Sequence, residues 1–559
     1  MATLTPKRKL PLFRVMLLGV ALLAVVGFAY NVFFGRRGEA AIAMIPADAT
    51  LVVTVDLVPS QAQIPAFKRI ADAMKREGLD HQLEDSAGSA IGSTALGKEL
   101  RPYLQHNMAF ATWNTADGKS SEVLLLPVSD KSQVSALLQK HGSKVDQSGT
   151  VSYKIGEQNR LMVVIGDYLV SSESAALLRR VQLTHDGAEK PVAQLPQYIE
   201  ARNALPSDAN LMVFVSPQGL SEAGKAAGTQ MTRSAKWMCF GAAIRDNGIR
   251  IDFRSPLEKD MVPPAGAGFL DPNFLAKVPT GALGIVAVAD PANTLEWVQK
   301  GLGKEKGAAE GIQAFEKESG ISVTQDIVPA LGGDLLIGVY PGASQKPIDL
   351  EAVLLVDSNN GADPAALATK IRTKIESDSA KDPKPVKFTR SQYGGAEVWA
   401  MDAAATKEIS DSAKEAGMGA KSPCLALIGK AIIMASSKPM MFTAIRAYRG
   451  TASLSTDPAF AAMSSQMTDR AQAATLISIH RVLDRMRPEF EKSKNMLISA
   501  DDIVNVFGGE NDGLVISGYV LGDQMVGTAF LPLDYDRAAK GIKSMSSPPR
   551  MSDPGSATK

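Results

Sequence analysis

The hydrophobic and polar positions of this 559-residue chain form one long pattern that occurs twice. Residues 45–56 (IPADATLVVTVD) return as residues 278–290 (VPTGALGIVAVAD). Each segment is a proline-containing turn followed by a short apolar run, which is typical of a turn that leads into a strand. The recurrence predicts that an ancestral unit of roughly 230 residues was duplicated behind a single N-terminal apolar segment.

Further strand-like segments recur in the same order. The matched pairs are 108–113 with 335–340, 122–128 with 351–357, 162–170 with 425–433, and 244–249 with 520–525. In the third pair a glycine, Gly166 or Gly429, separates two apolar runs, which predicts a tight hairpin. A serine pair follows in each copy (171–172 and 436–437) and predicts a capped helix start.

The fold class follows from these alternating elements. Short turns between neighbouring strands predict antiparallel sheets. An amphipathic stripe over residues 64–74, closed by Gly78, predicts a covering helix. We therefore expect an α+β protein with two tandem duplicated domains, each an antiparallel sheet with helices covering one face.

The first residues predict a membrane anchor. Residues 15–34 carry no charge and would span roughly 30 Å as a helix, enough to cross a bilayer. Four basic residues precede this run and two follow it, namely Lys7, Arg8, Lys9 and Arg14, then Arg36 and Arg37. The basic excess on the N-terminal side predicts a single-pass protein of the cell inner membrane, with the bulk of the chain extracytoplasmic, in the periplasm.

Two alternatives to the anchor stay open, a cleaved signal peptide and a buried core helix. Residues 41–43 (AIA) resemble a cleavage site, but the apolar run exceeds a signal core and Arg36 and Arg37 intervene. The predicted organisation is a cytoplasmic N-terminus over 1–14, a transmembrane signal-anchor over 15–34, extracytoplasmic repeats over 43–262 and 273–538, and a disordered tail over 544–559.

Composition supports a large folded exterior and argues against nucleic acid. Hydrophobic residues make up 45% of the chain and charged residues 21%, as in globular proteins. Residues 1–37 hold six basic and no acidic side chains, so the net charge of +1 leaves −5 for the rest. Nucleic-acid binding needs clustered Lys and Arg, which this exterior lacks.

The chain has two cysteines, Cys239 and Cys424, at non-equivalent places in the two copies. Both begin apolar runs, so buried thiols are expected, with one disulfide between the copies as the alternative.

The sequence holds no established catalytic motif, neither HExxH, GxSxG, a P-loop nor CxxC. The five histidines, His81, His106, His141, His185 and His480, are scattered, and no metal site, cofactor or catalytic residue is predicted. The glycines of 301–307 follow a helical pattern and are better explained as a helix stop than as a dinucleotide loop.

Two acidic motifs have a structural and a functional interpretation. Residues 331–334 (LGGD) precede a strand and are interpreted as a tight turn, with anion capture as the alternative. Asp56 and Asp290 end matched strands before a proline, which favours turn or cap chemistry over a shared carboxylate pair.

The anchor, the opening of residues 45–56 and the Pro102-x-Leu104 strand entry resemble a bacterial family of envelope proteins of unknown function. In that family the strand entry is LGGD, which this chain keeps in full only at 331–334. The resemblance spans most of residues 43–535. It implies a bacterial envelope location and carries over no catalytic residues.

Three functions remain open. The leading hypothesis is a non-enzymatic, membrane-anchored binding or scaffold protein of the envelope, with a protein partner. The second is a carrier of lipid or another apolar ligand, in a cavity lined by some of the 22 methionines. The third is an unrecognised hydrolase built from scattered acidic and hydroxyl residues.

Overall fold

The computed structural model divides the chain into two compact units, residues 1–256 and 257–559. It describes residues 39–56, 58–79, 94–105, 107–114, 120–147, 149–155, 160–227, 235–259, 268–294, 320–331, 333–344, 349–357, 364–380, 385–401, 422–492 and 513–546, with a few single positions between them.

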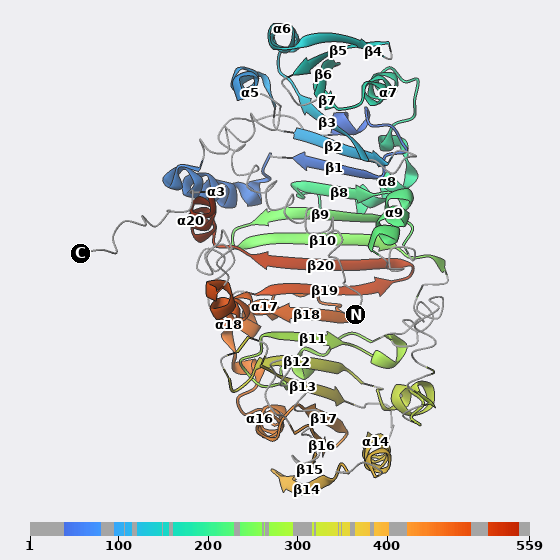
Figure 1. The fold of residues 1–559 in the computed structure, drawn as a ribbon, viewed down its shortest axis with the longest axis vertical. Coiled ribbons are helices and arrows are strands. Elements are labelled where there is room, and N and C mark those ends of the chain that lie inside the picture. The colour runs from blue at the N-terminus through green and yellow to red at the C-terminus, as the bar shows by residue number, and fades with distance from the viewer. Residues whose placement is uncertain are drawn as a thin grey trace, which may run out of the picture. The chain divides into compact units, whose positions relative to one another are not determined.

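The first unit is built on ten antiparallel strands (Figure 1). In spatial order they are β4 (Ser143–Gln147), β5 (Thr150–Ile155), β6 (Arg160–Ile165), β7 (Tyr168–Ser172), β3 (Ser120–Pro127), β2 (Asn107–Asn114), β1 (Leu51–Asp56), β8 (Leu211–Val215), β9 (Met238–Arg245) and β10 (Gly248–Pro256).

The second unit has ten described strands in the corresponding order, again all antiparallel. They are β14 (Phe388–Tyr393), β15 (Ala396–Met401), β16 (Cys424–Ile428), β17 (Ala431–Ala435), β13 (Leu350–Asp357), β12 (Leu335–Pro341), β11 (Gly284–Val288), β18 (Ala473–Ile477), β19 (Leu514–Leu521) and β20 (Gln524–Pro532). The expected α+β fold with antiparallel sheet is confirmed.

Helices pack on both faces of the sheet in each unit, so the expectation of a single covered face was wrong. In the first unit, α7 (Ala175–His185) and α8 (Pro196–Ala204) cover one face, while α5 (Thr94–Leu100) and α6 (Lys131–His141) cover part of the other. In the second, α16 (Lys438–Tyr448) and α17 (Pro458–Ser464) cover one face and α14 (Pro364–Ser379) part of the other. The strands are apolar on both faces, and each face can recruit a helix.

The remaining described helices lie between strands, except that α2 precedes β1 and α20 follows β20. They are α2 (Glu39–Ile42), α3 (Ile64–Glu77) and α9 (Pro217–Ala227) in the first unit, and α10 (Pro272–Leu275), α13 (Val328–Ala330), α18 (Ile479–Lys492) and α20 (Tyr535–Ser546) in the second. The predicted stripe forms α3, which ends at Gly78 with φ 69°, although Ile64 at its start is 46% exposed.

The glycine hairpins are confirmed. Ile165 pairs with Tyr168, and Ile428 pairs with Ala431, so each loop has two residues. Gly166 and Gly429 adopt φ of 58° and 59°, which an L side chain reaches only with strain. The serine-pair match was two residues out of register. The caps are Ser174 and Ser437, whose hydroxyls accept from the N–H of Leu177 and Met440.

The predicted anchor over 15–34 lies outside the described residues, as do the 301–307 glycines and the tail. Of the helices that the structure describes, none is long and apolar enough to cross a membrane.

A close backbone approach fixes the start of α9. A Cβ on Gly219 would lie 2.2 Å from the carbonyl oxygen of Thr50, the residue before β1.

We expect Gly219→Ala to lower the stability of the first unit by about 1–3 kcal/mol, despite alanine's better helix propensity. Hydrogen exchange of the β1 and β8 amides measures this. Gly268→Ala, where the added Cβ meets no atom within 4 Å, should leave exchange unchanged; equal effects would refute the steric explanation.

Candidate functional site

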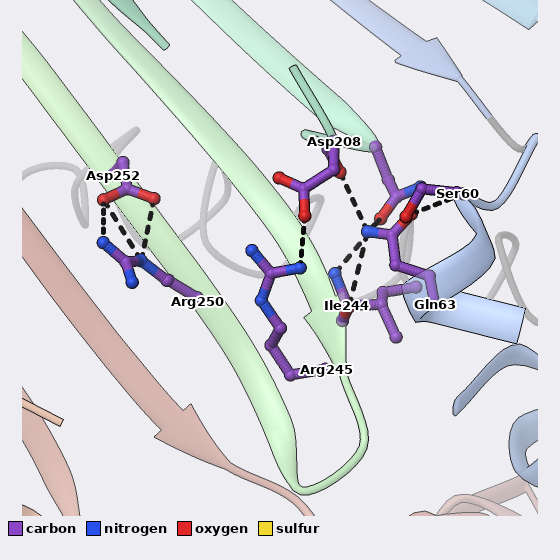
Figure 2. A network of polar contacts seen from close by, with 8 residues as sticks. Ser60, Gln63, Asp208, Ile244, Arg245, Arg250 and Asp252 are labelled. Carbon is purple, nitrogen blue, oxygen red and sulfur yellow. Dashed lines mark hydrogen bonds and ion pairs between the residues drawn. The ribbon is translucent and has the colours of Figure 1, made fainter. Parts of the chain in front are cut away.

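The most densely connected polar cluster of the first unit lies where β1 ends and α3 begins (Figure 2). The short 3-10 turn of Gln61–Gln63 leads into α3, and the backbone N–H of Ser60 donates to Oε1 of Gln63 at 3.0 Å. Pro65 in the first turn of α3 has no N–H to satisfy, which suits a helix start. This local chemistry turns the Gln63 side chain inward, where it is 1% exposed.

The Gln63 amide is fully engaged. Its Nε2 donates to the backbone oxygen of Asp208 at 2.8 Å, to Oδ1 of Asn210 at 2.7 Å and, more weakly, to the oxygen of Ile244 at 3.4 Å. A buried amide left without partners costs several kcal/mol, so these contacts make burial of Gln63 possible.

Asn210, which precedes β8, joins three strands. Its Oδ1 accepts from the N–H of Ile244 in β9 at 3.1 Å, and its Nδ2 donates to the oxygen of Asp56 at 3.3 Å and to Oε1 of Gln63 at 3.3 Å. Its backbone N–H donates to Ala242, and its carbonyl accepts from Asp56. We call this residue and its contacts the amide bracket.

Two ion pairs lie beside the bracket in Figure 2. Arg245 contacts Asp208 at 2.5 Å and lowers the pKa of that carboxyl. Arg250 donates to both carboxylate oxygens of Asp252, at 3.0 to 3.2 Å, and Asp252 is buried. All four groups are committed to charge-assisted bonds.

The second unit keeps the backbone contacts of the bracket and its side-chain bond to the third strand, with a different amide. Oε1 of Gln472, the residue before β18, accepts from the N–H of Val520 in β19 at 2.8 Å. The Gln472 N–H donates to Gly518 at 2.8 Å, and its carbonyl accepts from Ala289 at 2.7 Å. The backbone partners correspond one for one with those of Asn210.

In both units a backbone hydrogen bond also holds the turn that precedes the first strand. Val192 N–H donates to the oxygen of Ile45 at 2.8 Å, and Leu454 N–H donates to that of Val278 at 2.9 Å. The side-chain contacts differ. In the first unit the Asp48 carboxylate accepts from the indole of Trp113 at 2.9 Å and from Arg180.

In the second unit a buried ion pair holds this turn. The Asp457 carboxylate accepts from the N–H of Gly281 at 3.2 Å, caps α17 through Ala459 at 3.0 Å, and contacts Arg481 of α18 at 2.9 Å. Arg481 also donates to the oxygen of Ala282 at 3.2 Å. Burial would raise the pKa of Asp457, but the Gly281 N–H and the Arg481 guanidinium outweigh it, and the pKa is lowered.

Two of the acidic residues singled out in the sequence make local bonds, and the third bonds to a distant residue of its own unit. Asp56 Oδ1 accepts from the N–H of Val58 at 2.9 Å, and Asp290 accepts from Asn293, each within its own unit. Asp334 of LGGD accepts from the N–H of Asp271 at 3.0 Å. Burial, together with the charges of Asp271 and Asp357, raises the pKa of Asp334.

The histidines and cysteines do not gather into one site in the described residues. His141 contacts Glu99 at 3.0 Å and His480 contacts Asp484 at 3.0 Å, whereas His81 and His106 lie outside the described residues. Both cysteines are free and buried, as expected, and burial raises the pKa of Cys239 to about 12 and of Cys424 to about 11. Across the described ranges no three His, Cys, Asp or Glu side chains are placed to hold a metal ion.

A broad depression of about 720 Å³ lies along α14 in the second unit. Its lining includes Thr369, Lys370, Thr373 and Lys374 together with small residues, and Lys370 forms an ion pair with Asp326. An open depression of this kind does not enclose a ligand on all sides, as a site for a lipid chain requires.

The sequence analysis missed Asn210 and Gln472. A signal was present, since an amide residue immediately precedes a matched strand in each copy. It could not be interpreted, because its partners Ile244 and Val520 lie more than 30 residues further along the chain.

These features define an α+β protein whose buried polar groups join strands and turns. The chain belongs to the family described as proteins of unknown function (DUF3352), whose model matches residues 14–373, and the expected membership of an uncharacterised family is confirmed. No curated protein matches the chain.

Solved structures that match include crystal forms of a protein designated TP0453. Crystal form I has 13% identity and a TM-score of 0.24, and covers 39% of this chain and 79% of that one. Crystal form IV has 11% identity and a TM-score of 0.25, and covers 41% of this chain and 83% of that one.

The bracket predicts a large stability effect from one amide. Asn210→Leu would remove the side-chain acceptor of the Ile244 N–H and one acceptor of the Gln63 amide, so the first unit should lose about 2–4 kcal/mol of unfolding free energy. Denaturant titration with hydrogen exchange on β8 and β9 measures the loss. The matched variant Asn203→Leu, on the exposed side of α8, should change stability by less than about 0.5 kcal/mol. Similar losses in both would contradict the bracket's importance.

The buried pair predicts a pH-dependent defect in the second unit. Arg481→Leu leaves the Asp457 charge buried without its counter-ion and should cost about 3 kcal/mol at pH 7. The lowered pKa of Asp457 means that its stabilisation is present above its ordinary value near 3.8 and is lost as the pH falls through the folded-state pKa. The difference between variant and wild type should therefore shrink in acid.

Thermal unfolding between pH 7 and pH 3 checks this expectation. Adding Asp457→Asn to Arg481→Leu should restore part of the loss, since the unpaired charge is then gone. Arg487→Leu, which alters an exposed pair with Asp484, serves as the control and should have a small, pH-insensitive effect. A defect that persists unchanged at pH 3 would show that packing, not charge, is responsible.

Proposed function

We propose that this protein is a non-enzymatic binding or scaffold protein of the bacterial envelope. It would be anchored in the inner membrane by residues 15–34 and expose two duplicated units to the periplasm. A protein partner is the expected ligand. The uncharged N-terminal run of 20 residues and its basic flank support the anchor.

The observation that carries the proposal is the recurrence of the amide bracket at Asn210 and Gln472. The same backbone donors and acceptors recur around both residues, and this correspondence supports duplication of a whole unit. The bracket holds strands together in each unit, and in the first unit the neighbouring carboxylates of Asp208 and Asp252 are paired with arginines. A duplicated frame of this kind is better suited to presenting binding surfaces than to catalysing a reaction.

The alternative functions have less support. A lipid carrier would need an enclosed apolar cavity, whereas the apolar side chains between sheet and helices form four packed clusters in the described residues. A hydrolase would need converging titratable groups. The described carboxylates Asp48, Asp208, Asp252 and Asp457 instead each bind an arginine.

The test places a charge in the anchor. Leu23→Arg should release the chain from membranes during alkaline washing, because an arginine at the centre of a spanning helix costs about 2.5–3.5 kcal/mol. Leu23→Ile is the matched control and should stay in the membrane fraction. Wild-type chain should be degraded by protease added outside spheroplasts and protected in intact cells. Protection in spheroplasts, or membrane retention that does not depend on residue 23, would overturn the proposed anchoring and location.

A further inference from the structure

The second unit has an exposed apolar sheet face. Cross-strand neighbours on it form one row perpendicular to the strands, namely Ile516, Thr475, Val286, Ile337, Leu354 and Met434. Val286 is 42% exposed, Ile337 37%, Met434 39% and Ile516 40%. The opposite faces of the same strands are buried, as Ile285 and Leu336 illustrate.

The row continues from an interface that is already covered. Met434 pairs with Leu425, which pairs with Trp399, and both of these side chains are buried in the cluster that includes Leu367 and Ala368 of α14. Exposure rises from 8% at Leu425 to 39% at Met434. The sheet therefore has a buried apolar end and an exposed apolar continuation on one face, which marks an interaction surface.

Charge and shape restrict what could cover this face. At the described positions that share it in β13, β12, β11, β18 and β19, no side chain is charged, and Thr475 is the polar one. Small residues flank the row, namely Gly284, Ala352, Ala473 and Gly518. Strand register shows that the sequence match of 122 with 351 was one residue out, because Glu122 and Ala352 occupy equivalent positions. Glu122 is paired with Arg160, so this face of the first unit carries a charge.

The dimensions favour a broad occupant. From β17 to β19 the row crosses five strand spacings, about 24 Å, and the strands extend about 20 Å along the other direction. One helix is about 10 Å wide and would cover less than half of this area. A second sheet face of the same kind would bury at most about 500 Å² in projection from each copy, because the cluster under α14 already covers Leu335 and Val356 on this face. The total is therefore at most about 1,000 Å², the lower limit of specific interfaces.

We propose that this face pairs with the same face of a second copy of the chain. The two copies would meet through a two-fold axis, with sheets packed face to face about 10 Å apart and the rows of large side chains lying over the flanking small residues. None of the strand positions on this face is charged. Face-to-face contact of the strands therefore buries no unpaired charge in the apolar interface. The inference does not rest on the proposed function.

Cysteine cross-linking of the full-length chain in the cells that produce it tests the proposal. Single variants Val286→Cys, Ile337→Cys and Thr475→Cys, treated with a short bismaleimide, should give a covalent dimer. Leu521→Cys is the control, since Leu521 is 59% exposed but lies at the β19–β20 hairpin, off the row. The wild-type chain measures the background cross-linking from the buried Cys239 and Cys424.

Adding Ala352→Glu, which introduces the first unit's residue at an exposed position, should reduce the cross-linked dimer at least tenfold. Circular dichroism melting of this variant checks that the unit still folds, and Ala352→Ser in the same background should retain the dimer. Equal cross-linking at Leu521→Cys, a dimer that survives Ala352→Glu, or adducts to another protein instead of a second copy would overturn the proposal. The proposal would also be overturned if the cysteines on this face react with a maleimide only after detergent is added, because that would indicate lipid on the face.

Discussion

The structure depends on an amide side chain that joins three strands at one end of the strands in each unit. Asn210 and Gln472 connect, through both backbone and side chain, the strand that follows each of them to its two neighbours. A strand end has backbone groups that no ladder satisfies, and burying them is costly unless another group pairs with them. The amide side chain reaches beyond the ladder and supplies the missing bond, so that β1, β8 and β9, and likewise β11, β18 and β19, end together.

The two units share this frame but secure the preceding turn in different ways. In the second unit Asp457 caps α17 and binds Arg481, whereas in the first unit the cap position of α8 is Leu195, which has no side-chain acceptor. Gly219, two residues into α9, contacts the Thr50 carbonyl closely, while Arg481 at the corresponding place in α18 reaches Asp457 and Ala282. Backbone geometry is thus kept by hydrogen bonds common to both units, and side chains vary around it.

Local signals predicted local structure well. Gly166 and Gly429 place the hairpins correctly, because a two-residue loop needs a positive φ that glycine reaches without strain. The stripe before Gly78 gives α3 for a similar reason, since helix periodicity and a left-handed cap are both short-range. The serine match failed by two residues. Both Ser172 and Ser174 are followed by helix-forming residues, and only the strand register decides that Ser174 lies at the cap.

By itself the sequence determined the α+β class, the antiparallel hairpins and the burial of Cys239 and Cys424, and the structure decided that both cysteines are free. These follow from chain-local geometry and hydrophobicity. Tertiary structure alone decided which polar residues meet, such as Gln63 with Asn210 and Asp457 with Arg481, and that both sheet faces carry helices. It also decided that Val286, Ile337 and Ile516 share an exposed face while their neighbours in sequence are buried. The physical reason is that cross-strand register brings together residues separated by up to about 200 positions, and no short-range pattern encodes that pairing.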